Sequence, residues 1–324
     1  MLYISTRNTA DFYTAYRALH EEHAPDGGFY APYRLRAFTK EEIATIKRQS
    51  FGETVSQVLN RFFGLHLSGW DVECAIGRSA LKLESMNHRL IIAEAWHNPD
   101  SSWNYLLNSL YCLMVNGNGS TQFPSGWAYI AIEIALLCGL YSVLDHTQAD
   151  GFDLAVTTGD FSDVVAVLYA KYLGIPINVV VCTCNENSSI WDFINKGEFS
   201  TNAPIVKTNL PLLDVAIPKY LELFAFKCLG ADAAQKYLNA CNRKATYYVD
   251  DHQLKILNDG LYSAVVSTNR VDHIITSMVR ANQYHLDAYT ALAYGGLQDY
   301  RAQTGISKTT VLLAKRHPAH KEGG

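Results

Sequence analysis

The stretch that most constrains the fold lies between residues 152 and 181, where two apolar segments flank a helical one. Phe152 to Val156 has the pattern of a buried strand, Val164 to Gly174 that of a helix, and Ile177 to Val181 is a β-branched run. Such runs are typical of strands that are buried on both faces of a parallel sheet. The stretch therefore predicts a right-handed βαβ unit in an α/β fold. Outside this stretch, helices are predicted over residues 11–20, 51–63, 70–81 and 105–115.

The turn between the first strand and the helix, residues 158–163, is a candidate ligand site. Gly159 allows the backbone to pass close to a neighbour, and Asp163 is predicted to cap the helix that follows. In open α/β sheets, ligands bind outside the carboxyl ends of the strands, where this turn is expected to lie. A plain crossover without a ligand explains the same residues equally well.

Composition narrows the class of protein. The chain has 324 residues, of which 48% are apolar or aromatic, so it is long enough for one large or two modest domains. The formal net charge is −4 and the basic residues are scattered, which argues against a nucleic-acid partner. No apolar run reaches the about 18 residues that span a bilayer, because Glu133 interrupts the longest. The first residues lack the layout of a signal peptide, so we expect a soluble, cytoplasmic protein.

The cysteines give no sign of a disulfide framework or a metal site. There are seven, an odd number, and their spacing matches no framework. Cys182 and Cys184 lie at the end of a predicted strand, but no second pair of Cys or His residues lies nearby. We therefore expect small buried thiols and no bound metal.

The turn and its helix resemble a known enzyme family. Thr158 to Asp163 (T-G-D-F-S-D), with Ala170 to Ile177 (A-K-Y-L-G-I-P-I), resembles the threonine synthase segment S/T-G-N-F-G-D…A-K-x-x-G-L-P-I. Threonine synthase is an enzyme that uses pyridoxal phosphate (PLP). The resemblance implies an α/β, threonine-synthase-like fold of the tryptophan synthase β-like class, PLP fold type II.

Other segments resemble the family in the same order along the chain. Tyr3 to Arg7 resembles Y-x-S-T-R, and Pro25 to Pro32 resembles P-D-G-G-L-Y-x-P. Towards the C-terminal end, Asp287 to Ala293 resembles D-P-H-T-A-V-A. Val311 to His320 resembles L-x-T-A-H-P-A-K, with a basic pair where the family has small residues. The common order of the segments makes the resemblance stronger than any one of them.

The resemblance implies two domains and one deletion. Residues 1–86 correspond to the helical N-terminal domain, and residues 87–324 to a reduced fold-type-II α/β domain. In the family a small domain with an S-G-D-T-G-type loop follows the helix that carries the cofactor lysine. Here a glycine-rich bridge at residues 116–125 takes its place, so we expect most of the small domain to be deleted.

The lysine that binds PLP in the family is missing from the corresponding segment. A family strand ends in L-E-L-F-H-G-P-T-x-A-F-K-D, in which the lysine forms the Schiff base. In the matching segment of this chain, Glu94, His97 and Pro99 agree with the family and Asn104 stands at the lysine position. An asparagine amide is not nucleophilic and cannot form the imine. We therefore predict no catalytic residue at this position.

The phosphate loop is altered as well, and we interpret it as vestigial. Its residues are Gly159, Asp160, Phe161, Ser162 and Asp163. Asp160 stands where the family has a neutral asparagine, and a carboxylate repels a dianionic phosphate. Ser162 adds a side chain where the family has glycine. We therefore predict that no cofactor binds and that the ancestral PLP has been lost.

Thr290, in the D-A-Y-T segment, is a further vestigial cofactor position by the same resemblance. His97 and His317 are further candidate groups in the cleft that corresponds to the family's active site. Each of these residues also has an ordinary structural explanation.

We interpret the chain as a pseudoenzyme, a threonine-synthase-like protein with a binding or regulatory role. One alternative is a family enzyme acting on a phosphorylated amino acid such as O-phosphohomoserine, as a carbon–oxygen lyase or in threonine synthesis. A second alternative is PLP-independent chemistry in the old cleft, with general acids or bases drawn from His97, Asp160, Asp163, Thr290 and His317. We expect a protein partner or a second copy to cover the cleft, or a small amino acid to bind there.

Overall fold

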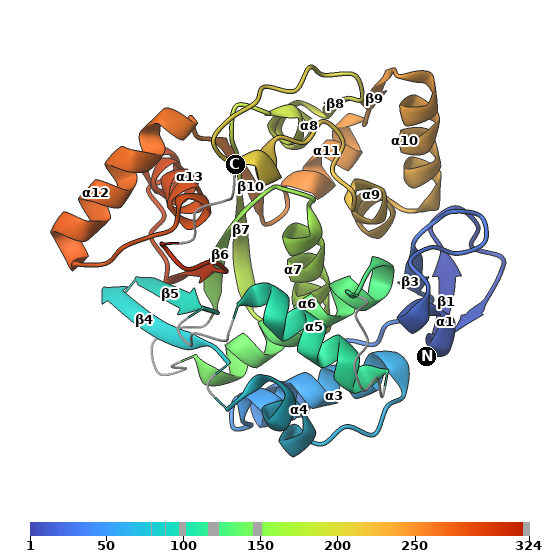
Figure 1. Cartoon of the computed structure of the whole chain (residues 1–324). Coiled ribbons are helices and arrows are strands. Elements are labelled where there is room, and N and C mark those ends of the chain that lie inside the picture. The colour runs from blue at the N-terminus through green and yellow to red at the C-terminus, as the bar shows by residue number, and fades with distance from the viewer. Residues whose placement is uncertain (79, 88, 97–101, 116–122, 145–150, 320–324) are drawn as a thin grey trace. The chain divides into compact units, whose positions relative to one another are not determined.

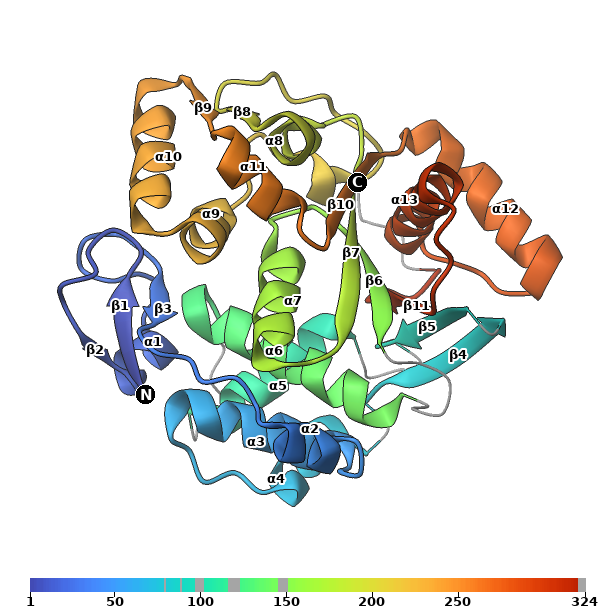
Figure 2. The same ribbon diagram turned by 180° about the vertical axis from the view of Figure 1, so that it is seen from behind.

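A computed structural model describes residues 1–78, 80–87, 89–96, 102–115, 123–144 and 151–319. The chain forms two compact units, each built from separate stretches of sequence. The first unit comprises Met1–Lys82, His97–Asp150 and Val165–Pro176, and the second comprises Leu83–Trp96, Gly151–Val164 and Ile177–Gly324. The two units are defined by contacts between residues of the chain. The predicted division into domains at residue 86 stays a prediction. Figures 1 and 2 show the elements from two sides.

A small antiparallel sheet opens the first unit. β1 (Leu2–Ser5) lies between β2 (Tyr13–Thr14) and β3 (Tyr30–Pro32). The sequence pattern suggested a helix from residue 11, but α1 (Ala15–His20) begins only at residue 15. The reason is local: the Thr14 hydroxyl accepts a hydrogen bond from the Arg17 amide and caps the helix, while the two residues of β2 pair with β1.

The first unit also contains five more helices, together with most of the later helix α7 (Ser162–Leu173). The five are α2 (Lys40–Ile46), α3 (Phe51–Phe63), α4 (Gly69–Ile76), α5 (Trp103–Met114) and α6 (Gly126–Val143). Helix α3 has the bounds that its apolar spacing predicts, because Ser50 and Glu53 form a capping box and Gly64 ends it at φ 69°. The predicted helix to residue 81 is too long, since α4 ends before Gly77, whose φ is 82°.

Helix α6 is the core helix of the first unit. By length and composition it could cross a membrane, with a mean hydropathy of 1.6 over 18 residues, so the expectation that no apolar stretch is long enough was wrong. However, 89% of the helix is buried, as in the core of a soluble protein. The buried Trp127 ring contacts Phe62 and Tyr169, and its indole N–H donates to the Tyr3 hydroxyl at 3.1 Å.

The second unit is built on a six-stranded sheet in the order β10-β7-β6-β11-β5-β4. Its strands are β4 (Lys82–Asn87), β5 (Leu90–Glu94), β6 (Phe152–Thr157), β7 (Ile177–Cys184), β10 (Leu261–Val265) and β11 (Thr310–Ala314). Neighbours from β10 to β5 pair in parallel. The predicted βαβ unit is therefore confirmed as β6, α7 (Ser162–Leu173) and β7. All the loops that follow these parallel strands leave the same edge of the sheet.

The remaining elements of the second unit surround this sheet. They are α8 (Ser189–Lys196), β8 (Glu198–Ser200), η1 (Pro211–Leu213), α9 (Leu221–Leu229), α10 (Ala231–Arg243), β9 (Thr246–Tyr248), α11 (Asp251–Asn258), η2 (Thr268–Arg270), α12 (Val271–Asn282) and α13 (Ala288–Thr304). Helix α13 packs on β6, β7, β10 and β11, and α12 packs on α13. In Figure 1 both helices lie on the left of the sheet, in orange and red. Their apolar faces and the sheet form one hydrophobic core.

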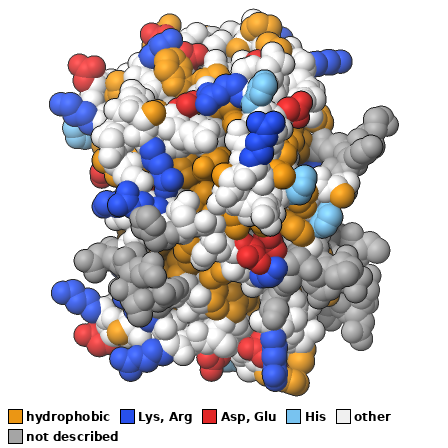
Figure 3. Space-filling model, turned by 90° about the vertical axis from the view of Figure 1, so that its left-hand side faces the viewer, with side chains coloured by type: hydrophobic (Ala, Val, Ile, Leu, Met, Phe, Trp, Pro, Cys, Tyr) orange, Lys and Arg blue, Asp and Glu red, His pale blue; other side chains and the backbone are white. Residues whose placement is uncertain are grey.

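The surface carries charges of both signs. In the space-filling view, basic side chains (blue) and acidic ones (red) are interspersed on the visible face, and neither sign forms a single large patch (Figure 3). All seven cysteines are free thiols. Within the described part of the chain, no three His, Cys, Asp or Glu side chains gather as a metal site would require.

Candidate functional site

The loop at residues 159–163, which the sequence analysis predicts as a vestigial phosphate loop, follows β6 at the carboxyl edge of the second unit's sheet. Its turn is closed by a hydrogen bond of 2.7 Å from the Phe161 amide to the Thr158 carbonyl. Gly159 has φ 42° and Phe161 has φ 72°, and the latter is an unusual conformation for a bulky residue. The fully buried Phe161 ring packs against Phe224 with the ring centres 4.9 Å apart. Phe161 thus anchors the loop in the core, and packing maintains the strained conformation.

The Asp160 carboxylate lies at the start of helix α7. Its Oδ1 accepts a hydrogen bond of 3.0 Å from the Ser162 amide, and its backbone carbonyl accepts one of 3.0 Å from the Tyr220 amide. No ion pair is formed by Asp160 with the residues that the structure describes. A negative charge is favoured at a helix N-terminus by the peptide dipoles. The chain's own carboxylate therefore uses an amide donor of this loop.

Asp163 does not cap helix α7. The helix begins at Ser162, one residue before it, so Asp163 lies in the first turn and its side chain turns to the end of β11. There the Lys315 ammonium donates to the Asp163 carboxylate in an ion pair. Both side chains are mostly buried, with 23% and 19% of their surfaces exposed. The pair joins the loop after β11 to the start of the βαβ helix.

Arg316 is the next residue after Lys315, and it contacts the N-terminal turn of helix α13. Its guanidinium lies over the Tyr289 ring, 4.9 Å from the ring centre. Asp287 caps α13: it accepts hydrogen bonds from the Tyr289 and Thr290 amides and from the Thr290 hydroxyl. Burial raises the pKa of the Asp287 carboxyl, while these hydrogen bonds and the charge of Arg316 oppose the rise. Thr290, predicted as a cofactor position, is buried and engaged within the cap.

His317 is the third residue of this turn, and it is exposed. Its Nδ1 accepts a hydrogen bond of 3.0 Å from the Ala319 amide, and its ring packs edge-on against Trp96 with 4.7 Å between ring centres. His97, the other cleft histidine of the sequence analysis, lies outside the described residues. Three successive residues after β11 therefore contact three different segments: the start of α7, the start of α13 and the end of β5.

Asn104 lies in helix α5 of the first unit, whereas the phosphate loop belongs to the second. The predicted helix from residue 105 starts earlier, at Trp103, because the Ser102 hydroxyl caps it. Trp103 is buried and donates from its indole N–H to Glu133 at 3.0 Å, while Asn104 is exposed in the first turn. Its assignment to the Schiff-base position stays a prediction.

The structure thus brings together, within one unit, the loop at 159–163, Thr290 and His317. It adds two residues that the sequence analysis did not select, Lys315 and Arg316. The sequence could have indicated both residues, because they come directly after an apolar strand of a predicted parallel sheet. Ligands bind at that edge of such sheets. The predicted bridge falls largely outside the described residues, so the predicted deletion stays a prediction.

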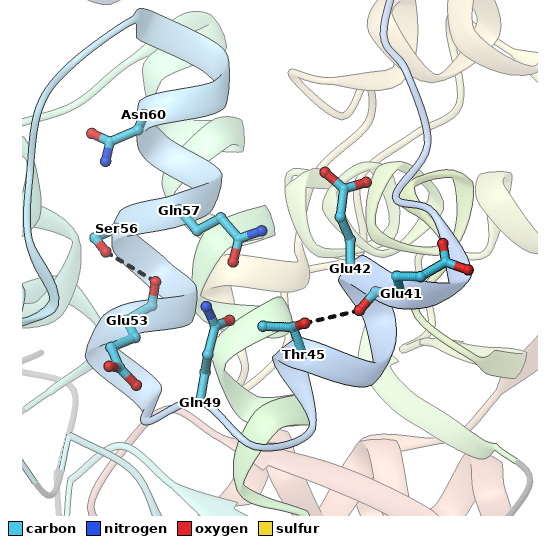
Figure 4. Close-up of a pocket in the computed structure, with 8 residues that line it drawn as sticks. All are labelled: Glu41, Glu42, Thr45, Gln49, Glu53, Ser56, Gln57 and Asn60. Carbon is cyan, nitrogen blue, oxygen red and sulfur yellow. Dashed lines mark hydrogen bonds between the residues drawn. The ribbon is translucent and has the colours of Figure 1, made fainter.

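A separate polar hollow lies between α2 and α3 in the first unit (Figure 4). It has a volume of about 600 Å³, and none of the predicted site residues lines it. Two of its glutamates accept hydrogen bonds from backbone amides of helix N-cap residues. Glu42 accepts from Thr39, and Glu53 accepts from Ser50. Acidic residues stabilise helix N-termini, so these two have a structural explanation.

Comparisons with known proteins agree with this architecture. A family model described as "Threonine synthase N terminus" matches residues 2–79. Threonine synthase of Schizosaccharomyces pombe is 25% identical over 217 residues, covering 60% of this chain and 42% of that protein. Mouse threonine synthase-like 1 is 31% identical over 111 residues, covering 33% of this chain and 15% of that protein. These alignments cover less than half the length of either relative.

Solved structures agree as well. PLP-bound threonine synthase from Brucella melitensis superposes with a TM-score of 0.85 at 18% identity, covering 98% of this chain and 89% of that one. The yeast enzyme gives a TM-score of 0.80 at 14% identity, covering 98% and 87%. The chain thus resembles the threonine synthase family in sequence at its N-terminal end and in fold over nearly its whole length. Its fold is that of the PLP fold-type-II enzymes, as the sequence resemblance implied.

Proposed function

We propose that this chain is a member of the threonine synthase family that has lost PLP-dependent catalysis and acts by binding another molecule. The observation that carries the proposal is the Asp160 carboxylate, which accepts the hydrogen bond of the Ser162 amide at the start of α7. In a phosphate-binding loop, amides at this place are needed by the ligand. Here one of them is occupied by a negatively charged side chain of the chain itself.

Electrostatics supports the same conclusion. Two unit charges 5 Å apart repel by about 3 kcal/mol at an effective dielectric constant of about 20, and a phosphate dianion roughly doubles this. Lys315 would offset part of the repulsion, but it is engaged with Asp163. Within the described part of the chain, the Asp160 carboxylate of the loop thus has no ion-pair partner. The residues present do not suit the phosphate of PLP.

Among the residues that the structure describes around the loop, Lys315 is a lysine that contacts it. In an ion pair with Asp163, Lys315 is an ammonium, which is not nucleophilic. Asn104 itself is neutral and exposed. The proposal therefore assigns no catalytic residue and no step through the cofactor. In this proposal, the α/β scaffold, the N-terminus of α13 and the turn after β11 form a surface that binds another molecule.

We place this role in the cytoplasm. All seven cysteines are free, and Cys138, Cys182 and Cys184 are buried. Unpaired thiols in this number are typical of a reducing compartment. The burial of α6 is likewise that of a core helix rather than of a membrane span.

An activity assay tests the proposal against its enzymatic alternative. The purified chain is incubated with excess PLP and O-phosphohomoserine, and the release of inorganic phosphate is followed, with an active threonine synthase as the positive control. We expect release no faster than without protein. Phosphate release that depends on both PLP and the chain would refute the loss of catalysis and establish a working carbon–oxygen lyase.

A further inference from the structure

The segment at residues 202–219 of the second unit exposes a group of aliphatic side chains. Ile205, Val206, Leu212 and Ile217 have 51%, 48%, 50% and 40% of their surfaces exposed. We call this segment the docking loop. In Figure 1 it runs from β8 over the top of the view to α9. Single exposed apolar residues are normal, whereas four of them within one short segment are a candidate interaction site.

The docking loop is held in one conformation by the Asp214 carboxylate. That group accepts hydrogen bonds from the Thr208 amide at 2.6 Å, the Thr208 hydroxyl at 2.8 Å and the Asn185 amide group at 2.8 Å. It also accepts one of 3.0 Å from Asn187. Asn185 and Asn187 come directly after β7, so a rigid strand end fixes the loop. A surface that is already ordered loses little entropy when a partner binds.

Recognition at this loop must use side chains. The Asn187 side chain brackets Val206: it accepts from the Val206 amide at 2.8 Å and donates to the Val206 carbonyl at 2.9 Å. The amide of Thr208 is also engaged. The backbone groups of Val206 and the amide of Thr208 are therefore not available to pair with a strand of another chain. A partner that offers a row of apolar side chains on a helix face satisfies this condition.

Charge defines the partner further. Between residues 202 and 219 the chain has two lysines, Lys207 and Lys219, and both are exposed. Asp214 is the acidic residue of the loop, and its carboxylate is surrounded by the donors that hold the loop. The two lysines of the loop are thus exposed while its one carboxylate is engaged, and this charge is complementary to an acidic partner.

The docking loop borders the candidate site. The Leu212 amide donates to the Tyr289 hydroxyl at 3.4 Å, and a Cβ on Gly159 would lie 3.7 Å from the Leu212 carbonyl. A molecule on the loop would thus lie beside the vestigial phosphate loop and the turn after β11. This continuity links the loop to the binding role proposed above.

We propose that the docking loop binds an acidic amphipathic helix of a partner protein. The inference rests on the proposed binding role and names its surface and partner. A second copy of the chain is disfavoured, because a symmetric contact would bring the same lysines together. A lipid surface is disfavoured because the loop has no tryptophan or tyrosine, the residues that favour membrane interfaces.

A displayed library of random 16-residue peptides tests this on the full chain. We expect selection to enrich peptides with Leu, Ile or Phe at positions i, i+4 and i+7 and Asp or Glu between them. The affinity of the enriched peptides for Ile205→Ser/Leu212→Ser should fall at least tenfold. The charge reversal Lys207→Glu/Lys219→Glu should weaken binding similarly, and salt should weaken binding to the unmodified chain. Because the substituted residues are exposed, the variants should keep the thermal melting temperature of the parent.

The matched control is Ile256→Ser/Ile306→Ser, which removes two similarly exposed isoleucines of the same unit from outside the loop. It should leave peptide affinity unchanged. No enrichment, or enriched peptides that bind all variants equally, would overturn the proposal. Two other results would also overturn it. One is a dimer of the chain in sedimentation velocity that Ile205→Ser/Leu212→Ser abolishes. The other is binding to phosphatidylserine vesicles that the same variant abolishes. Peptide binding by a chain that also releases phosphate from O-phosphohomoserine would refute only the loss of catalysis.

Discussion

At the scale of single residues, the turn after β11 connects the segments of the candidate site. Lys315, Arg316 and His317 contact Asp163, Tyr289 and Trp96 respectively. These contacts join the loops of neighbouring parallel strands at the edge where such sheets bind ligands. Each of these three side chains is therefore engaged in a contact within the second unit.

The Lys315–Asp163 pair should matter for stability. Replacing Lys315 with Met leaves a mostly buried carboxylate without its cation, and we expect a loss of about 1–2 kcal/mol in the free energy of unfolding. Urea denaturation measures it. The control is Lys196→Met, which breaks the more exposed i,i+4 pair with Asp192 and should cost clearly less, because solvent screens that pair. Equal losses of unfolding free energy in the two variants would mean that the partly buried pair stabilises the fold no more than the exposed pair does.

At the scale of elements, the close approach of helix α13 to the sheet fixes the position of the site. Gly296 faces Thr183 of β7 so closely that an added Cβ would lie 2.0 Å from the Thr183 Oγ1. The same helix begins at the Asp287 cap, beside Arg316 and Tyr289. A shift of α13 away from β7 would therefore also move the N-terminus of the helix at the candidate site.

A double-mutant cycle tests this packing. Gly296→Ala forces a methyl group into the threonine side chain, and we expect a loss of about 1–3 kcal/mol from overpacking. Thr183→Ala alone removes a small side chain whose buried hydroxyl has no hydrogen-bond partner among the described residues, so its cost should be smaller. The double variant should be more stable than the sum of the two losses predicts, by about 1 kcal/mol. Strict additivity in urea denaturation would show that the two positions do not meet.

At the scale of the whole molecule, local patterns predicted much of the fold. The βαβ unit followed from a buried strand, a helix and a β-branched run, and α3 followed from its apolar spacing. The order of matching segments predicted the family. Two helix starts were misplaced, at Asp11 and Tyr105, because the capping hydroxyls of Thr14 and Ser102 decide where those helices begin.

Contacts between distant residues were beyond such patterns. Asp163 and Lys315 are 152 positions apart, and no local signal links them, so a helix cap was the simplest interpretation of Asp163. The same holds for the Asp214 network, which joins the end of β7 to a loop more than twenty residues later. The candidate loop could be found from sequence, but its surroundings depend on the sheet order.

The central claim, that these residues no longer hold PLP, is tested most directly by the absorbance of the cofactor itself. The purified chain and an Asn104→Lys variant are mixed with excess PLP and dialysed, and the visible spectrum is recorded before and after borohydride. We predict no retained aldimine band in either protein, because the loop with Asp160 does not hold the phosphate even when a lysine is supplied. A stable band in the unmodified chain that borohydride reduces would contradict the account, since some lysine would then reach a bound cofactor.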